Sequence, residues 1–139
     1  MKISKEGLNK LILREGKRNK AYKDTKGIWT IGVGHTGPEV HEGLLWSDEK
    51  VMEALDKDLA WAEAAVNDAV VVPLAQHQFD ALVSFVFNVG VRAFLNSTLL
   101  KKLNIGNYFG AGKEFDRWHI PREIIGRRNS ERDQFNGHS

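Results

Sequence analysis

Residues 15–35 read EGKRNKAYKDTKGIWTIGVGH, and this stretch decides how the first third of the chain folds. The segment before it predicts a helix from Ser4 to about Arg14, because Ser4 is a good N-cap and apolar residues follow at helical spacing. Gly16 suits the position just after a helix end, where a positive φ is common. Glu15 is therefore expected to project from the end of a helix.

The stretch 21–33 is expected to form a short β-meander. Gly27 supplies the unusual backbone angle that a turn at 24–27 requires. Residues 28–31 are β-branched or aromatic, and these residue types favour strands. Residues 36–45 are expected to form a loop.

The rest of the chain is predicted to be helical. Acidic residues after Ser47 begin a long apolar pattern that ends at Pro73, and such a helix spans on the order of 35 Å. This length favours a connector between two small lobes rather than an element of one lobe. Three or four shorter helices are expected to follow, at about 74–90, 97–104, 107–118 and 127–136.

Composition excludes several classes of function. The chain has 139 residues and no cysteine, so disulfides, Cys-ligated metals and thiol catalysis are excluded, which suits a reducing cytoplasm. The longest apolar run, 69–75, is too short to span a bilayer. No apolar segment follows the charged N-terminus, so no signal peptide is expected.

The net charge of +2 is distributed unevenly. Residues 1–30 carry nine Lys or Arg against three acids, and residues 101–139 carry eight against five. Residues 31–100 carry only three Lys or Arg against ten acids. The two basic ends could attract an anionic polymer, and bacterial cell wall and nucleic acid fit this charge equally well.

Two carboxylates and a hydroxyl in the opening stretch are the candidate chemistry. Glu15 at a helix end, Asp24 at a turn and Thr30 in a strand are what a glycosidase needs around a sugar linkage and a water. Each residue also has an ordinary interpretation. Glu15 could be a solvated carboxylate, Asp24 a turn residue, and Thr30 a residue that favours strands.

Two other patterns are weak. The glycines of Gly32-Val-Gly34-His-Thr-Gly37 formally match a dinucleotide fingerprint, but Pro38 and a loop follow where a helix should begin. We expect Gly34 instead to let the backbone approach a sugar ring closely. The five histidines show no metal-ligand spacing, so no metal or other cofactor is predicted.

The spacing Glu15-x8-Asp24-x5-Thr30-x4-His35, with Gly-x-Gly before the histidine, resembles the active-site region of the phage-type lysozymes, or endolysins, of glycoside hydrolase family 24. The resemblance continues through 73–90, 96–104, 115–118 and 126–132, which look like the family's later helices. Residues 119–125 depart from the family pattern at the far wall of its groove.

The resemblance implies an α+β fold, mostly α, in one lysozyme-like domain with two lobes and a cleft between them. The N-terminal lobe, about 1–58, would hold a small antiparallel sheet and the catalytic residues. The connector helix would span about 59–72, and 73–139 would form a helical C-terminal lobe.

The resemblance also implies roles for individual residues. Glu15 would donate a proton to the leaving oxygen, while Asp24 and Thr30 manage a water on the opposite face of the sugar. His35 would be structural, with Asp58 as its expected partner, and Arg127 would reach toward Glu15, although a solvated basic helix face explains Arg127 equally well. Further groove positions, of which Phe87 could instead be plain core, are Ser84, Phe87, Asn88 and Arg117.

The predicted activity is inverting hydrolysis of the β-1,4 bond between N-acetylmuramic acid and N-acetylglucosamine in peptidoglycan, causing host-cell lysis. The expected state is a monomer in the host cytoplasm, with no nucleic-acid partner and no stable membrane association. A separate membrane-permeabilising protein would give it access to the wall. Two alternatives stay open: a lytic transglycosylase or chitinase that uses Glu15, and a non-catalytic module that binds wall or nucleic acid through the basic ends.

Overall fold

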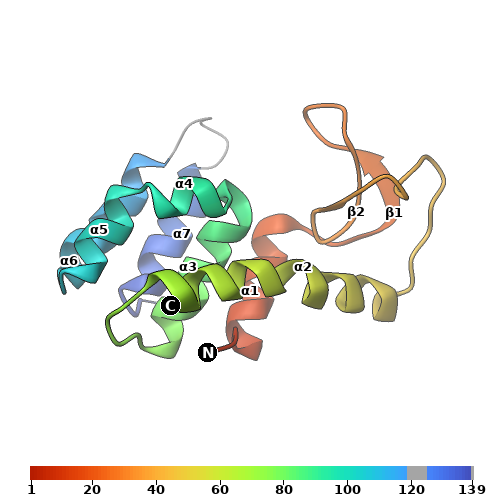
Figure 1. The fold of residues 1–139 in the computed structure, drawn as a ribbon. Helices are drawn as coiled ribbons and strands as arrows, with labels where there is room; N and C mark the ends of the chain where they lie inside the picture. The colour runs from red at the N-terminus through yellow and green to blue at the C-terminus, as the bar shows by residue number, and fades with distance from the viewer. Residues whose placement is uncertain (119–124, 139) are drawn as a thin grey trace. The chain divides into compact units, whose positions relative to one another are not determined.

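The computed structural model describes residues 1–118 and 125–138, so most of the divergent stretch 119–125 lies outside the described residues. Helices predominate, and a small sheet follows the first of them (Figure 1). The elements are α1 (Lys5–Glu15), β1 (Arg18–Lys23), β2 (Trp29–Gly32), β3 (His35–Thr36), α2 (Asp48–Ala69), α3 (Gln76–Val89), α4 (Val91–Leu95), α5 (Thr98–Asn104), α6 (Tyr108–Glu114), the 3-10 helix η1 (Phe115–Arg117) and α7 (Ile125–Phe135).

The chain divides into two compact units. The sheet unit comprises Asn9–Ala60, and the helical unit comprises Met1–Leu8 together with Trp61–Ser139. The first residues group with the helical unit because Ser4 hydrogen-bonds through its backbone N–H and its hydroxyl to the buried Asp80. The expected lobe limits placed this segment with the sheet instead, because polar contacts across more than seventy residues leave no local pattern.

In the sheet unit, β1, β2 and β3 form an antiparallel sheet in that order. Side chains alternate between its two faces. One face presents Ala21, Trp29 and Ile31 to the unit's core, which is completed by Val40, Leu44 and Trp46. The opposite face carries Tyr22 and Thr30, which lie directly across from each other in the β1–β2 pair.

The first strand begins at Arg18, earlier than the β-meander predicted from residue 21. The reason is pairing rather than propensity. The Ala21 N–H donates to the Leu44 carbonyl at 2.9 Å, and the Trp46 N–H donates to the Asn19 carbonyl at 2.7 Å. These bonds hold residues 18–20 in an extended conformation, although such a charged segment has little intrinsic preference for a strand.

In the helical unit, α3 packs against α7, and α5 packs against α6 (Figure 1). The aromatic core contains Phe85, Phe115 and Phe135 in successive ring contacts, with Trp118 edge-on to Phe85 at 5.3 Å. This contact packs Trp118 against the aromatic core of the unit. Phe94, which is fully buried, anchors the short helix α4 that the sequence analysis missed after Gly90.

Local signals placed several helix ends correctly. Gly16 has φ +78°, and its N–H donates to the Ile12 carbonyl after α1. The Ser97 hydroxyl accepts from the Leu100 N–H at the start of α5, and the Asn107 side chain caps α6 in the same way. The long helix α2 has 22 residues and is roughly 33 Å long, and the division between the two units falls inside it.

Candidate active site

Glu15 is the last residue of α1 and is half-buried. The helix ends there because Gly16 takes a left-handed conformation that other residues adopt at a cost. The side chain therefore leaves the helix at its carboxyl end, beside the first strand of the sheet, as the sequence predicted.

Asp24 lies in the turn between β1 and β2. Its Oδ1 accepts hydrogen bonds from the backbone N–H groups of Lys26 and Ile28 at 2.8 and 2.9 Å, and Gly27 has φ +79°. One oxygen of Asp24, Oδ1, therefore stabilises the turn, as the ordinary interpretation of Asp24 predicts. Both of these bonds use Oδ1, so Oδ2 lies outside the turn's own hydrogen bonding and suits contact with a water.

Thr30 lies on β2 and is only 4% exposed. Its hydroxyl donates to the Ile28 carbonyl at 3.0 Å, which occupies the hydroxyl hydrogen. The remaining lone pairs of Oγ1 can only accept, which is the property needed to hold a hydrogen of a water.

Tyr22 is the residue that the sequence analysis missed at this place. The guanidinium of Arg18 lies over its ring, 4.8 Å from the centroid. Burial raises the pKa of the phenol, and so do the negative charges of Glu15 and Asp24, while Arg18 acts in the opposite direction. Both candidate carboxylates are therefore within electrostatic reach of one phenol. The sequence did contain one signal for Tyr22. It precedes Asp24 by two residues, and side-chain alternation along a strand puts such residues on the same face.

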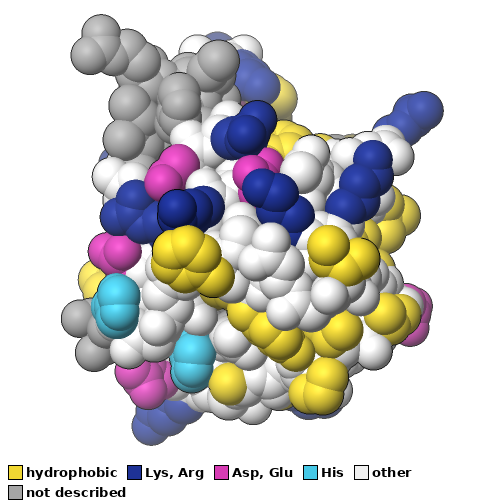
Figure 2. Space-filling model, turned by 90° about the vertical axis from the view of Figure 1, so that its left-hand side faces the viewer, with side chains coloured by type: hydrophobic (Ala, Val, Ile, Leu, Met, Phe, Trp, Pro, Cys, Tyr) yellow, Lys and Arg dark blue, Asp and Glu magenta, His cyan; other side chains and the backbone are white. Residues whose placement is uncertain are grey.

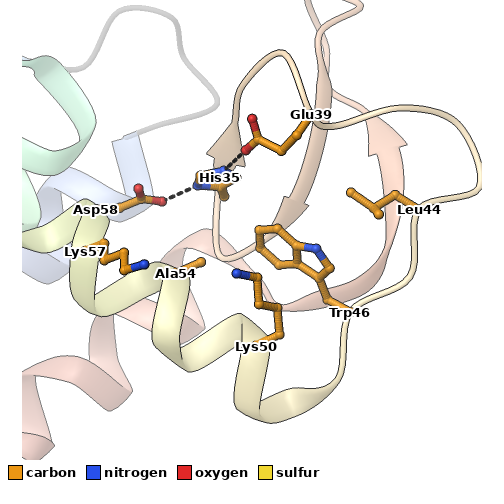
Figure 3. A pocket seen from close by; sticks show the side chains of 8 residues that line it. All are labelled: His35, Glu39, Leu44, Trp46, Lys50, Ala54, Lys57 and Asp58. Carbon is orange, nitrogen blue, oxygen red and sulfur yellow. Dashed lines mark hydrogen bonds and ion pairs between the residues drawn. The ribbon is translucent and has the colours of Figure 1, made fainter.

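His35, at the start of β3, is held by two carboxylates. Its Nδ1 contacts Asp58 Oδ2 and its Nε2 contacts Glu39 Oε1, each at 2.6 Å (Figure 3). The predicted contact with Asp58 is therefore formed, and Glu39 is an additional partner. Burial lowers the pKa of His35, but the hydrogen bonds to Glu39 and Asp58 outweigh it and raise the pKa overall.

The His35 cluster borders a cavity of about 490 Å³ (Figure 3). The Trp46 ring lies 5.2 Å from His35, and Lys50 approaches the same ring at 5.5 Å. The imidazole is thus fixed by ring packing on one side and by ion pairs on both nitrogens. Both ring nitrogens therefore contact carboxylates, and the structural role expected for His35 stays a prediction.

Gly34 has φ +68° in the short connection between β2 and β3. Because a strand rather than a helix follows it, the glycine pattern is not a dinucleotide-binding loop. The backbone conformation alone accounts for a glycine at this position. Close approach to a sugar stays a prediction.

The remaining predicted residues lie in the helical unit. Ser84 is fully buried, and its hydroxyl donates to Glu131 Oε2 at 2.5 Å. Arg127 pairs with the same oxygen at 3.1 Å and donates to the Ser84 carbonyl. The Ser84 side chain has no exposed surface, and its predicted place in the groove stays a prediction. Glu131 is fully buried and joins this network through Ser84 and through Arg127 and Arg128 of its own helix. The sequence analysis missed it because its contact with Ser84 spans 47 residues.

The other three groove candidates differ in exposure. Asn88 is exposed and accepts from Arg128 at 2.8 Å, while Arg117 is exposed and pairs with Glu114 at 3.1 Å. Phe87 is half-buried and stacks on Trp61 at 5.9 Å. Of the groove candidates, Ser84 and Asn88 are joined through the network around Glu131. Phe87 and Arg117 have separate partners.

Two negative findings apply to residues 1–118 and 125–138. No group of three or more His, Asp or Glu side chains among them could hold a metal ion. No helix among them is long and apolar enough to cross a membrane. One face of the molecule shows Lys and Arg side chains, with Asp and Glu among them, above exposed hydrophobic ones (Figure 2).

Comparison with known proteins identifies relatives across nearly the whole chain. The phage lysozyme family matches residues 13–131. The endolysin of Salmonella phage P22 is 45% identical over 143 residues, which cover 97% of this chain and 98% of that protein.

Solved structures agree. The muramidase domain of SpmX from Asticaccaulis excentricus is 38% identical with a TM-score of 0.88, covering 96% of this chain and 97% of that one. The endolysin of Escherichia coli O157:H7 phage FAHEc1 is 33% identical with a TM-score of 0.92, covering 97% and 93%. These matches confirm the predicted fold class and the resemblance on which the site was built. The chain therefore belongs to the phage lysozyme family and is a glycoside hydrolase.

Proposed function

We propose that Glu15, Asp24 and Thr30 carry out the hydrolysis that membership of the family assigns to this enzyme. The substrate is the β-1,4 linkage between N-acetylmuramic acid and N-acetylglucosamine in peptidoglycan. The observation that supports these roles is the position of Tyr22, whose phenol is acted on by the charges of both Glu15 and Asp24. Both carboxylates thus lie within electrostatic reach of Tyr22, which is paired with Thr30 across β1 and β2.

The proposed reaction is a single displacement. Glu15 gives its proton to the glycosidic oxygen as the bond from that oxygen to the anomeric carbon breaks. A water held by Thr30 attacks the anomeric carbon from the opposite face, and Asp24 Oδ2 takes the proton that the water loses. One C–O bond breaks and one forms, and the protonated Asp24 and ionised Glu15 then exchange protons with solvent.

Single displacement inverts the anomeric centre and requires room for the water, with the carboxyl groups about 6.5–9.5 Å apart. Rapid NMR of the fresh reducing end should therefore show the α-anomer first. A retaining enzyme would instead use Asp24 as a covalent nucleophile at about 5–5.5 Å from the acid. An initial β-anomer, or a glycosyl adduct on Asp24, would refute the role given to Thr30.

The deciding experiment replaces Glu15 with Gln and follows muropeptides released from purified peptidoglycan by mass spectrometry. Glu15→Gln keeps the shape of the side chain but removes the transferable proton, so product release should fall at least 100-fold. Glu6→Gln is the matched control, because Glu6 is an exposed glutamate of the same helix. Retention of more than a few per cent of activity in Glu15→Gln would remove Glu15 as the acid.

The same products separate the alternatives. A hydrolase leaves a reducing end, whereas a lytic transglycosylase leaves a 1,6-anhydro end, and a chitinase would cut chitin oligosaccharides in preference to wall. A non-catalytic module would bind wall fragments in a salt-sensitive way without reducing their turbidity. The family membership does not favour either alternative.

Several finer expectations belong to the same proposal. Asn88, Arg117 and Phe87 contact the glycan, since their side chains reach the surface, while Arg127 and the His35–Asp58 pair support the site. The enzyme acts as a monomer and leaves the host cytoplasm through a separate membrane-permeabilising protein. Sedimentation analysis tests the first of these two statements. Lysis of expressing cells with and without a co-expressed pore-forming protein tests the second.

A further inference from the structure

The unassigned group nearest to the proposed chemistry is the Tyr22 phenol. In the β1–β2 pair Tyr22 lies directly opposite Thr30, and paired residues of an antiparallel sheet project on the same face. The core residues Ala21 and Ile31 occupy the other face. Packing in the unit's core therefore does not explain a large polar aromatic side chain at this position.

The phenol stays a donor. The Arg18 guanidinium lies over the face of the ring, 4.8 Å from its centroid, and leaves the ring-plane hydroxyl outside this contact. Burial and the charges of Glu15 and Asp24 raise the phenol pKa, which keeps the O–H protonated. The two hydroxyls of this face therefore have complementary hydrogen-bonding roles. The Tyr22 hydroxyl can donate, whereas the Thr30 hydroxyl already donates to the Ile28 carbonyl and can only accept a further hydrogen bond.

A water that attacks a carbon needs four directed contacts. Its two hydrogens need acceptors, one lone pair must point at the anomeric carbon, and the other lone pair needs a donor. Thr30 Oγ1 and Asp24 Oδ2 provide the two acceptors in the proposed mechanism. Neither of them can supply the donor, since Asp24 is an ionised carboxylate at that stage and the Thr30 hydrogen is used.

We propose that the Tyr22 hydroxyl donates the hydrogen bond that completes the coordination of the attacking water, opposite Thr30. The inference rests on the proposed function and adds a positioning residue to it. Tyr22 takes no proton and forms no bond to substrate. It fixes which lone pair of the water faces the anomeric carbon.

The test is steady-state kinetics of Tyr22→Phe on a soluble peptidoglycan fragment. Phe keeps the ring and the Arg18 contact and removes only the donor, so kcat should fall about 10- to 100-fold with KM changed less than about twofold. Tyr108→Phe is the matched control. Tyr108, the other tyrosine of the chain, also donates through its hydroxyl, to the Pro73 carbonyl at 2.6 Å, but lies in the helical unit. It should keep wild-type kcat.

A merely structural role is excluded by a double-variant cycle. If Tyr22 and Thr30 hold the same water, the loss in kcat for Tyr22→Phe with Thr30→Ala should be clearly smaller than the product of the two single losses. Strictly multiplicative losses would overturn the shared water. So would a Tyr22→Phe enzyme with normal kcat, or one whose only change is a lower Tm.

The two levels of the proposal fail separately. If Glu15→Gln retains activity, the catalytic roles are wrong whatever Tyr22 does. If Glu15→Gln is inactive and Tyr22→Phe is normal, only the role of Tyr22 is wrong.

Should Tyr22→Phe not fold, full-length enzyme made with 3-fluorotyrosine decides the matter. A stronger phenol donor at Tyr22 should change kcat in the wild type and leave the Thr30→Ala enzyme nearly unaffected, and no change in the wild type would overturn the inference.

Discussion

Replacing Asp58 with Asn should destabilise the enzyme at acidic pH and much less at alkaline pH. Asp58 Oδ2 lies 2.6 Å from His35 Nδ1, and the two side chains are 27% and 19% exposed. Hydrogen bonds to charged groups contribute about 1.5–3 kcal/mol. Because both partners keep some contact with water and Glu39 still holds the imidazolium, we expect the lower part of that range, about 1–2 kcal/mol.

The direction of the pH effect follows from the raised pKa of His35 in the folded protein. A raised pKa means that the folded state binds the proton more tightly than the unfolded state, where a histidine titrates near about 6.5. The stabilisation is therefore fully present below about pH 6.5. It is lost as the pH rises through the folded pKa, because the neutral imidazole carries no charge and keeps only one N–H to donate to the two carboxylates.

The assay is thermal unfolding followed by circular dichroism at pH 5.5 and pH 8.5. For a chain of this length the expected loss corresponds to a fall in Tm of about 3–8 °C at the lower pH. Asp56→Asn is the control, since Asp56 is an exposed acid on the same helix. An equal fall at both pH values, or the same fall in the control, would refute the argument that an imidazolium ion pair is responsible.

Two further predictions test packing and surface charge. Gly7→Ala should lower the free energy of unfolding by about 1–3 kcal/mol, because an added Cβ would lie 2.5 Å from the Asp80 carboxyl carbon. Gly126→Ala in α7 should be neutral or stabilising, because an added Cβ there would have no atom within 4 Å. Urea titration measures both changes. Lysis of permeabilised cells should fall as salt is raised, since screening lengths drop from about 10 Å at 0.1 M to about 3 Å at 1 M, and small soluble oligosaccharides should show little effect. Equal salt responses for both substrates would remove electrostatic capture of the wall.

The sequence predicted those features of the fold that depend on neighbouring residues. The end of α1 follows from Gly16, the first turn of α5 from Ser97, and the turn at Asp24 from Gly27, each a local device with a known backbone preference. The early start of β1 could not be predicted in this way. Its hydrogen bonds go to residues 44–46, and the segment itself is highly charged.

The same distinction between local and long-range contacts applies to the candidate site. The spacing of Glu15, Asp24 and Thr30 placed each on its local structure, because a helix end, a turn and a strand are each a few residues long. It could not reveal the place of Tyr22 opposite Thr30, which depends on the register between two strands, or the contact of Glu131 with Ser84 on a different helix. Contacts of this kind carry no short-range signature.

Register also gives a physical reason for the glycines of this segment, beside the predicted approach of Gly34 to a sugar. Because strand side chains alternate, a slip of one residue between β1 and β2 would move Thr30 into the core and Ile31 onto the functional face. Gly27, at φ +79°, allows the tight turn between β1 and β2, and Gly34, at φ +68°, allows the short connection between β2 and β3. The β1–β2 register does shift between Arg18 and Tyr22, so the pairing that keeps Thr30 opposite Tyr22 is the part next to the Gly27 turn, and there a glycine matters most for the alternation of the two faces.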